Sequence, residues 1–350
     1  ELSDFASRRC KVIFMSMRQA IIDFPKQFEF DPVIERAGEL RQMPAVIVSG
    51  MGGSHLAADL LKSARPSLNL FIHRDYGLPP MQEAYFKNCL FIASSYSGNT
   101  EEVLDGLGEA EKKGMTVAAL SVGGQLEKLA REQNLPYVKL PDTSIQPRSA
   151  LGFSLLALVK LMGLEQELTE LHALSHALDA GKAEQQGIAL SEQLSGHIPV
   201  VYASGRNEAV AYNWKIKCNE TGKIPAFYNV FPELNHNEMT GFSAEGGSAS
   251  GGDAPVGTRA LIEKFHFIFL RDSEDDPHII KRMDICRDLY MQRGLPVTDV
   301  MLEGSTRWER IFNSLLVADW FSFYTGTSYG VETEQVPMVE EFKLAISKMQ

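Results

Sequence analysis

Short apolar segments alternate with segments of helical length along most of this chain, and this rhythm limits the folds it can adopt. Strands are expected at 45–49, 68–73, 89–93, 116–120, 137–140, 199–203, 265–270 and 297–302. Helices are expected between them, at 55–64, 101–113, 125–133, 149–161, 208–221, 277–293 and 307–324. Strands that alternate with helices in this way form parallel sheets covered on both faces. The sequence therefore predicts a doubly wound α/β fold.

The alternation of strands and helices is interrupted once, and this interruption predicts the domain organisation. Residues 163–196 read as polar and helical, which is typical of a connector. We expect one domain over 1–160, a helical connector over 161–195, and a second domain over 196–350 that ends in a C-terminal helix. The second half looks like a structural repeat of the first, without a clear repeat of residues. With 350 residues, 44% of them apolar, the chain has enough material for two cores.

Composition narrows the class of protein. The net charge of −11 opposes binding to nucleic acid or to acidic membranes. No apolar run reaches the roughly 18 residues of a membrane span, and the start has no signal pattern. The four cysteines, Cys10, Cys89, Cys218 and Cys286, are far apart and suggest reduced thiols in a cytoplasmic protein. Neither cysteine nor histidine spacing predicts a metal site, and we expect no metal or other cofactor.

The segment 91–102 reads as a buried strand, a turn rich in hydroxyl groups and the start of a helix. A helix start offers backbone N–H groups and a favourable dipole to an anion. Ser95, Ser97 and Thr100 add hydroxyl donors, and Gly98 lets the backbone approach closely. The alternative is ordinary capping of the helix by Asn99 or Thr100. The second half has no such turn, so we expect one phosphate site per chain.

A second glycine-rich turn follows the strand at 45–49. The run Gly50-Met51-Gly52-Gly53-Ser54 lacks the dinucleotide fingerprint, because His55 stands where its last glycine would be, and it lacks the lysine of a P-loop. Backbone N–H groups and Ser54 would nevertheless suit a sugar or a phosphate. The alternative is close packing of a helix on a strand.

Two polar runs in the second half hold groups suited to proton transfer. The first, 217–223, is a helix end in which Lys217 and Lys223 suit the C-terminal dipole, whereas the Glu220 carboxylate opposes it. The second, 233–238, has Leu234 as its only apolar residue and contains His236. Carboxylates and histidines are the usual general acids and bases. An ordinary polar loop is the alternative.

Taken together, these segments resemble one family. The runs Gly50-Met51-Gly52-Gly53-Ser54, Ser95-Tyr96-Ser97-Gly98-Asn99-Thr100-Glu101, Pro147-Arg148-Ser149-Ala150-Leu151-Gly152, Asn219-Glu220 and Glu233-Leu234-Asn235-His236-Asn237-Glu238 are similar, in the same order, to the bifunctional phosphoglucose/phosphomannose isomerases. That family is built from two SIS (sugar isomerase) domains of flavodoxin-like topology. The resemblance implies an isomerase that converts glucose 6-phosphate, and mannose 6-phosphate as well, to fructose 6-phosphate.

The resemblance also implies a role for each matching residue. Gly53, Ser54, Ser95, Ser97 and Thr100 would hold the sugar phosphate. Glu220 would move a proton between C1 and C2, and Arg148 would lie near the developing enediolate. His236, donated by the partner subunit of a homodimer, would assist ring opening, and Lys343 would act with it. In the family, a residue near this lysine makes room for mannose 6-phosphate, the C2 epimer of glucose 6-phosphate. Its candidates in this chain are Thr333, Gln335 and Val336.

Two other classes of function remain open from the sequence. A non-catalytic SIS module that senses a sugar phosphate would keep the phosphate turn but would not need Glu220 and His236. An SIS enzyme of the amidotransferase type, which makes an amino sugar phosphate, would need a source of ammonia, and no N-terminal catalytic cysteine precedes the domain here. The stretch 243–257, rich in glycine, serine and alanine, is expected to be a mobile loop over a site.

Overall fold

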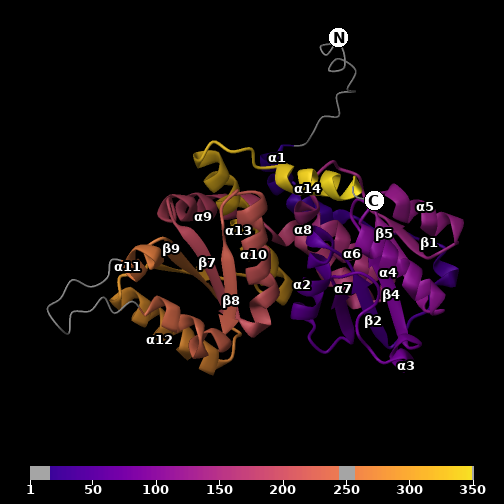
Figure 1. Ribbon diagram of the computed structural model, residues 1–350, viewed down its shortest axis with the longest axis horizontal. Coiled ribbons are helices and arrows are strands. Elements are labelled where there is room, and N and C mark those ends of the chain that lie inside the picture. The colour runs from indigo at the N-terminus through magenta and orange to yellow at the C-terminus, as the bar shows by residue number, and fades with distance from the viewer. Residues whose placement is uncertain (1–15, 244–256, 349–350) are drawn as a thin grey trace, which may run out of the picture.

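Two sheets organise the computed structural model, which describes residues 16–243 and 257–348 (Figure 1). The first sheet has six strands in the order β1-β6-β5-β4-β2-β3. Their bounds are β1 Ile34–Glu35, β2 Ala45–Ser49, β3 Leu70–His73, β4 Cys89–Ser94, β5 Thr116–Ser121 and β6 Tyr137–Lys139. All neighbours pair in parallel except β1, which runs antiparallel to β6 and was not predicted. Two residues are too few for a periodic pattern, so no signal in the sequence predicts this strand.

The second sheet has four parallel strands in the order β10-β9-β7-β8. Their bounds are β7 Ile198–Ser204, β8 Phe227–Phe231, β9 Phe265–Arg271 and β10 Val297–Met301. Strand β8 was also missed by the sequence analysis. It is the edge strand beside β7, and Phe227 is 53% exposed while only Phe231 is buried. A short edge strand with exposed aromatic residues lacks the continuous apolar run of a central strand.

The strand orders confirm the predicted doubly wound fold. Without β1, the first sheet follows the flavodoxin-like order 2-1-3-4-5, and the second follows the first four places of the same order. In such sheets, ligands bind beyond the carboxyl ends of the two central strands where the order reverses. This switch point lies between β2 and β4 in the first sheet and between β7 and β9 in the second.

Helices cover both sheets and fill the space between them. Their bounds are α1 Met17–Ile22, α2 Leu56–Ala64, α3 Glu83–Phe86, α4 Glu101–Lys112, α5 Gly124–Glu132, α6 Leu151–Leu161, α7 Glu165–His172, α8 Leu174–Ala177, α9 Ala180–Gln193, α10 Glu208–Glu220, α11 Gly257–Ile262, α12 Pro277–Gln292, α13 Arg307–Ser328 and α14 Pro337–Ser347. No helix within the described residues is long and apolar enough to cross a bilayer.

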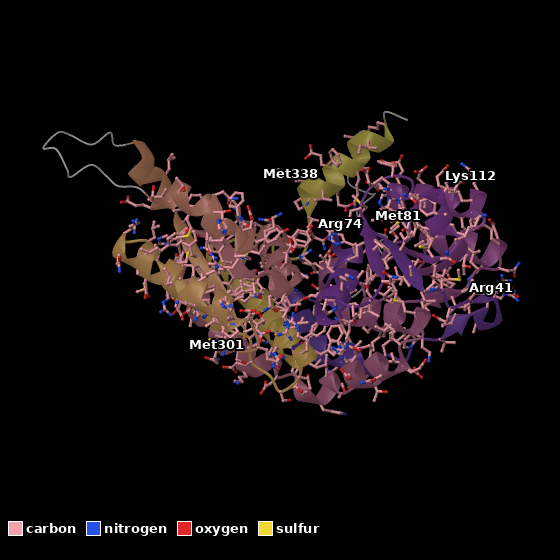
Figure 2. The ribbon with its side chains drawn as sticks, turned by 90° about the horizontal axis from the view of Figure 1, so that it is seen from below. Arg41, Arg74, Met81, Lys112, Met301 and Met338 are labelled. Atoms are coloured by element: carbon pink, nitrogen blue, oxygen red, sulfur yellow. The ribbon has the colours of Figure 1, made fainter. Side chains whose placement is uncertain are left out.

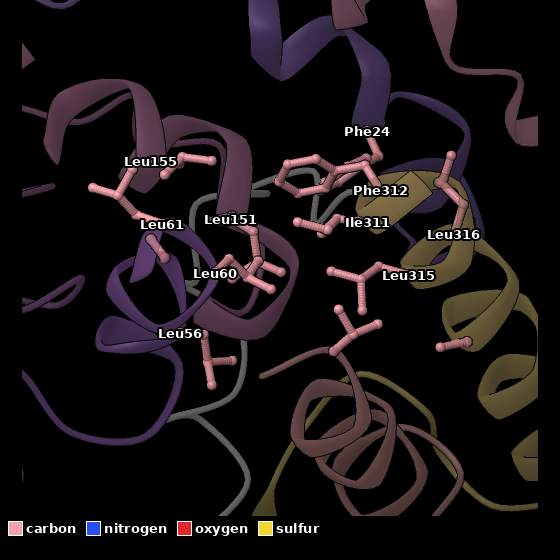
Figure 3. Packing of buried hydrophobic residues seen from close by; sticks show 14 of the residues in the cluster. Phe24, Leu56, Leu60, Leu61, Leu151, Leu155, Ile311, Phe312, Leu315 and Leu316 are labelled. Carbon is pink, nitrogen blue, oxygen red and sulfur yellow. The ribbon is translucent and has the colours of Figure 1, made fainter. Parts of the chain in front are cut away.

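One continuous apolar core joins the two halves. Figure 3 shows Leu56 and Leu60 from α2 and Leu151 from α6 facing Ile311 and Leu315 from α13. All five side chains are at most 1% exposed. Burial of apolar area is the main favourable term in folding, and the core resists separation of the two sheets. The loops at the carboxyl edge of the first sheet are therefore held in place against α10 of the second half.

The segment that reads as a connector packs on the second half. Helix α9 lies along α13, and Gly187 makes this close approach possible, because a Cβ atom there would lie 2.3 Å from Cβ of Trp320. The indole N–H of Trp320 donates to the carbonyl of Ala180, at 2.7 Å. Residues 244–256, which include most of the loop expected over a site, lie outside the described residues, as does Cys10; Cys89, Cys218 and Cys286 are free and buried.

Candidate active site

The two turns singled out in the sequence lie side by side at the first switch point. Strand β2 ends at Ser49 and β4 at Ser94, and these strands pair directly in parallel. The turns after them are joined by two hydrogen bonds. The Ser94 hydroxyl donates to the carbonyl of Ser54, at 2.8 Å, and the Tyr96 N–H donates to the Ser54 hydroxyl, at 2.9 Å. The glycine-rich turn and the hydroxyl-rich turn thus form one surface.

The hydroxyl groups of the second turn do not cap the helix that follows. Thr100 occupies the N-cap position of α4, but its side chain makes no cap hydrogen bond. Its hydroxyl pairs with that of Ser95 at 2.8 Å, and Ser95 also accepts from the N–H of Gly98 at 3.1 Å. The carboxamide oxygen of Asn99 accepts from the N–H of Gln125, at the start of α5. Thr100 is thus the N-cap residue, as the capping alternative expects, but neither its side chain nor that of Asn99 caps α4, and the hydroxyl groups remain grouped at the start of the helix.

Gly98 and Ser97 complete this turn. Gly98 has φ +73°, and a Cβ atom there would lie 1.8 Å from the carbonyl oxygen of Gly123, so only glycine fits. Ser97 is exposed, and its hydroxyl accepts from the N–H of Asn99 at 3.2 Å. A turn with this fixed backbone presents hydroxyl groups and a helix start at one place, which is the chemistry that binds phosphate.

Gly53 links this surface to Arg148. A Cβ atom on Gly53 would lie 2.7 Å from Cβ of Pro147 and 2.9 Å from the backbone nitrogen of Arg148. The glycine-rich turn therefore packs against the short helix Pro147–Ser149 that carries the arginine. Because the backbones are in contact, any larger residue at this position would push the turn and the arginine apart.

The guanidinium of Arg148 joins three parts of the chain. Its side chain is 1% exposed. Nη1 lies 3.2 Å from Oε2 of Glu220, Nε donates to the Thr221 hydroxyl at 2.9 Å, and Nη2 donates to the carbonyls of Thr333 and Glu334 at 3.0 and 2.7 Å. Burial lowers the pKa of the guanidinium, and the Glu220 carboxylate acts in the opposite direction. The result is a fixed cation beside one carboxylate.

Glu220 is the last residue of α10, as expected, and its side chain is 32% exposed. The carboxylate is thus buried enough to be held by Arg148 and open enough to meet a ligand. The unfavourable interaction of a carboxylate with a helix C-terminus is offset here by a cation from another part of the fold. The structure brings Gly53, Arg148 and Glu220 into one continuous cluster.

Of the two lysines expected to suit the dipole at this helix end, the structure places only one there. Lys223 fits this expectation, because its ammonium donates to the carbonyl of Glu220 in the last turn. Lys217 does not. It is buried in an ion pair with Asp319 of α13, at 2.6 Å, where both side chains are at most 4% exposed. Burial raises the pKa of Asp319, and the ammonium of Lys217 opposes that rise. The sequence showed lysines near a helix end but not which of them faces inward.

The segment before α14, which holds the candidates for the residue beside the C2 epimer, contacts the cluster through backbone carbonyls that the sequence did not predict. Lys223 donates to the carbonyl of Gln335 at 2.5 Å, next to the two carbonyls that Arg148 binds. Burial and the Arg148 cation both lower the pKa of Lys223. These contacts use backbone carbonyls, which every residue has, so the residue types in the sequence do not reveal them. Thr333 and Gln335 are therefore near Glu220, although no motif marks them.

His236 is held away from Glu220 of the same chain. Helix α10 runs back along β7, so Glu220 lies at the amino edge of the second sheet. Strand β8 then crosses from that edge to the carboxyl edge, about 13 Å at 3.3 Å per residue. His236 follows β8 in the short helix Glu233–His236 and is exposed. The two residues are thus at opposite edges of this sheet.

Lys343 is likewise separate from the cluster. It lies on α14, its side chain is 64% exposed, and it pairs with Glu340 of the same helix at 2.8 Å. Helix α14 begins at Pro337, two residues after Gln335. The structure thus places the start of this helix near the site and leaves Lys343 in solvent within the single chain.

The second switch point is occupied by protein groups. The Ser204 hydroxyl, which ends β7, donates to Asp275 at 2.6 Å, and Asn207 donates to the same carboxylate at 3.2 Å. Arg307 is paired with Asp272 at 2.9 Å in the same buried network. The donors of Ser204, Asn207 and Arg307 are thus already bound by carboxylates of the protein. Within the described residues, no three histidine, cysteine, aspartate or glutamate side chains gather as a metal-binding group.

Comparison with known proteins identifies the kind of domain that this chain contains. Residues 183–346 match the family described as bacterial phospho-glucose isomerase C-terminal SIS domain. The fold is similar to that of glucosamine-6-phosphate deaminase from Thermotoga maritima, with a TM-score of 0.63 at 16% identity over 92% of this chain and 97% of that one. The fold and the family match therefore place the chain among proteins built from SIS domains.

The sequence relatives define the group more narrowly. The bifunctional phosphoglucose/phosphomannose isomerase of Thermoplasma acidophilum is 30% identical over 86% of this chain and 89% of its own length. The enzyme of that name from Caldicellulosiruptor bescii is 29% identical over 95% of this chain and 99% of its own length. The chain belongs to the bifunctional phosphoglucose/phosphomannose isomerase family, as its motifs predict.

Proposed function

We propose that this protein is a cytoplasmic aldose–ketose isomerase that interconverts glucose 6-phosphate and mannose 6-phosphate with fructose 6-phosphate through an enediolate. The observation that carries the proposal is the contact of Arg148 with Glu220 beside the Gly53 turn. This contact supports the proposal because it joins a carboxylate and a fixed cation to a turn whose hydroxyl groups and helix start suit a phosphate. Family membership supports the same activity.

Each group has a role that follows from its chemistry. The phosphate is bound by the backbone at Gly53 and by the hydroxyls of Ser54, Ser95, Ser97 and Thr100, without a metal or other cofactor. This anchors one end of the substrate. The reacting carbons, C1 and C2, then lie toward the second half of the chain, where α10 ends.

Isomerisation moves one proton between neighbouring carbons. The carboxylate of Glu220 removes the proton from C2 of the open-chain aldose and returns it to C1. The proton of the C2 hydroxyl passes to the C1 oxygen, and the carbonyl thereby shifts from C1 to C2. General acid–base catalysis of this kind contributes about 10²- to 10⁴-fold. The enediolate oxygen gains negative charge, and Arg148 stabilises it by several kcal/mol, the order measured for single oxyanion donors. The buried position of Arg148 keeps that cation fixed before the reaction begins.

Ring opening precedes proton transfer and needs a separate acid or base. We assign it to His236 of a second copy of the chain, because His236 of the same chain lies at the opposite edge of the second sheet from Glu220. Lys343 acts with this histidine on the ring oxygen. The protein is then a homodimer with two composite sites, each built from both copies.

Complementation tests the composite site. Glu220→Gln and His236→Ala should each be inactive alone. After mixing and reassembly, half of the dimers are heterodimers, and each has one site with both changes and one with neither, so activity should return to about a quarter of wild type. Subunit exchange is measured by mass spectrometry. If exchange occurs and activity does not return, His236 does not act in the partner's site.

The substrate class needs its own assay. Fructose 6-phosphate, glucose 6-phosphate and mannose 6-phosphate are supplied with and without an ammonia donor. Turnover of all three without ammonia supports the isomerase. A product that forms only with ammonia would favour an amidotransferase-type enzyme, and tight binding without any turnover would favour a sensing module.

A further inference from the structure

Helix α14 carries an apolar stripe that the described residues of its own chain leave largely exposed. Met338, Val339 and Phe342 are 81%, 45% and 63% exposed. At 100° per residue, these three fall on one side of the helix, together with Ala345 and Ile346. Figure 2 shows α14, with Met338 labelled near its start, standing out from the rest of the molecule. An isolated helix of 11 residues is marginal in water, so this one needs a surface to pack on.

An apolar groove in the second half offers such a surface. It lies between the segment after β8 and helix α12, and its volume is about 440 Å³. Met239, Ile285 and Leu289 line it, and Ile285 is 50% exposed. Lys281 and Arg282 also line the groove. Arg282 donates to the Asn235 carboxamide oxygen at 3.4 Å, and neither cation has a carboxylate within ion-pair distance in the part of the chain that the structure describes.

The groove and α14 complement each other in charge as well as in polarity. Glu341 borders the apolar stripe of α14 on one side, next to Met338. A carboxylate at the edge of the stripe meets Lys281 or Arg282 at the edge of the groove when the stripe enters it. Opposite charges around an apolar centre are the usual anatomy of a specific interface.

Within one chain this contact is not possible. In Figure 1, α12 and α14 lie far apart, at the outer end of the second half and above the first half. A second copy of the chain can bring its groove to α14. Asn235 lines the groove and is adjacent to His236, while α14 begins two residues after Gln335, which Lys223 binds beside Glu220. A partner that delivers His236 to the Glu220 site therefore delivers its groove to the neighbourhood of α14.

We propose that α14 of each copy docks in the groove between the 235–239 segment and α12 of the other copy, and that this exchange of helices positions His236 in the partner's site. This inference rests on the proposed function only for the composite site; the docking itself is a contact between surfaces. Lys343 borders the stripe on the side opposite to Glu341, so docking also brings it from solvent toward the partner's His236. A two-fold axis repeats the contact, so each dimer contains it twice.

Cross-linking tests the docking directly. Because Cys286 lines the groove, all variants carry Cys286→Ala. A chain with Phe342→Cys is mixed with a chain with Ile285→Cys and oxidised after subunit exchange. We expect a covalent dimer, since a disulfide needs Cα atoms within about 7 Å. Each chain alone should stay uncross-linked, and so should Glu340→Cys, on the opposite face of α14, mixed with Ile285→Cys. A dimer band of equal strength for Phe342→Cys and Glu340→Cys would overturn the docking.

A second measurement does not depend on disulfide geometry. Phe342→Asp should raise the dissociation constant of the dimer by at least about tenfold in analytical ultracentrifugation, the scale of a buried aromatic anchor. Far-ultraviolet circular dichroism should be unchanged, because Phe342 is exposed in the single chain. An unchanged dissociation constant would refute the proposal. Complementation by Glu220→Gln and His236→Ala without cross-linking would overturn the docking alone, whereas cross-linking without complementation would overturn the role of His236 alone.

Discussion

Replacing Glu220 by glutamine distinguishes a catalytic role of its carboxylate from a purely structural role. The amide keeps the shape of the side chain but cannot take a proton from carbon at neutral pH. If Glu220 is the proton shuttle, kcat should fall by at least about 10²-fold, the lower end of the range for general acid–base catalysis. This corresponds to a barrier raised by about 2.7 kcal/mol or more, at 1.36 kcal/mol per tenfold change in rate.

The structure predicts a much smaller effect on stability. The Glu220 side chain is 32% exposed, and exposed ion pairs contribute about 1 kcal/mol or less. Arg148 keeps its three other acceptors, the Thr221 hydroxyl and the carbonyls of Thr333 and Glu334. The guanidinium is therefore not left buried without partners. We expect the melting temperature to fall by no more than a few degrees.

The assay should report proton transfer itself. Exchange of the C1 proton of fructose 6-phosphate with deuterium from the solvent is followed by NMR, beside a coupled assay of net isomerisation. Glu220→Gln should lose both. Glu208→Gln is the matched control, because it makes the same chemical change at the exposed start of the same helix and should keep both activities. Near-normal exchange in Glu220→Gln would refute the assignment of Glu220 as the base.

Three other predictions test different parts of the argument. Thr100→Val removes the hydroxyl that pairs with Ser95, so binding of fructose 6-phosphate should weaken by about 1 to 3 kcal/mol, with a smaller effect on stability. An unchanged KM together with a large loss of melting temperature would instead favour a purely capping role for Thr100. Dialysis against a strong chelator should leave turnover intact, and loss of activity that zinc restores would contradict the mechanism. Burial lowers the pKa of His266 from 6.5 to about 4, so between these pH values the unfolded chain binds more protons than the folded chain. The free energy of unfolding should therefore fall by up to about 3 kcal/mol as pH drops from 6.5 to about 4. His266→Gln should remove most of this dependence on pH.

Much of the fold follows from local sequence. The apolar runs at β2 and β4 and the glycines after them are local signals, and the structure places a strand and a turn at each. Glu220 also ends its helix where the sequence indicates. These features depend on neighbours a few residues away, through hydrogen bonding of the backbone and the conformations that glycine allows.

The tertiary structure alone decides which of these local features meet. Arg148 and Glu220 are 72 residues apart, and Arg148 reaches Glu334 across 186 residues, through a backbone carbonyl that any residue could supply. Lys217 and Lys223 lie in one helix end, yet one is buried against Asp319 and the other faces the site. The parallel β8 separates His236 from Glu220, although only 16 residues part them in the chain. Local pattern fixes the direction and the faces of each element, but only packing across the whole core fixes which faces come together, because that choice depends on contacts between residues distant in the sequence.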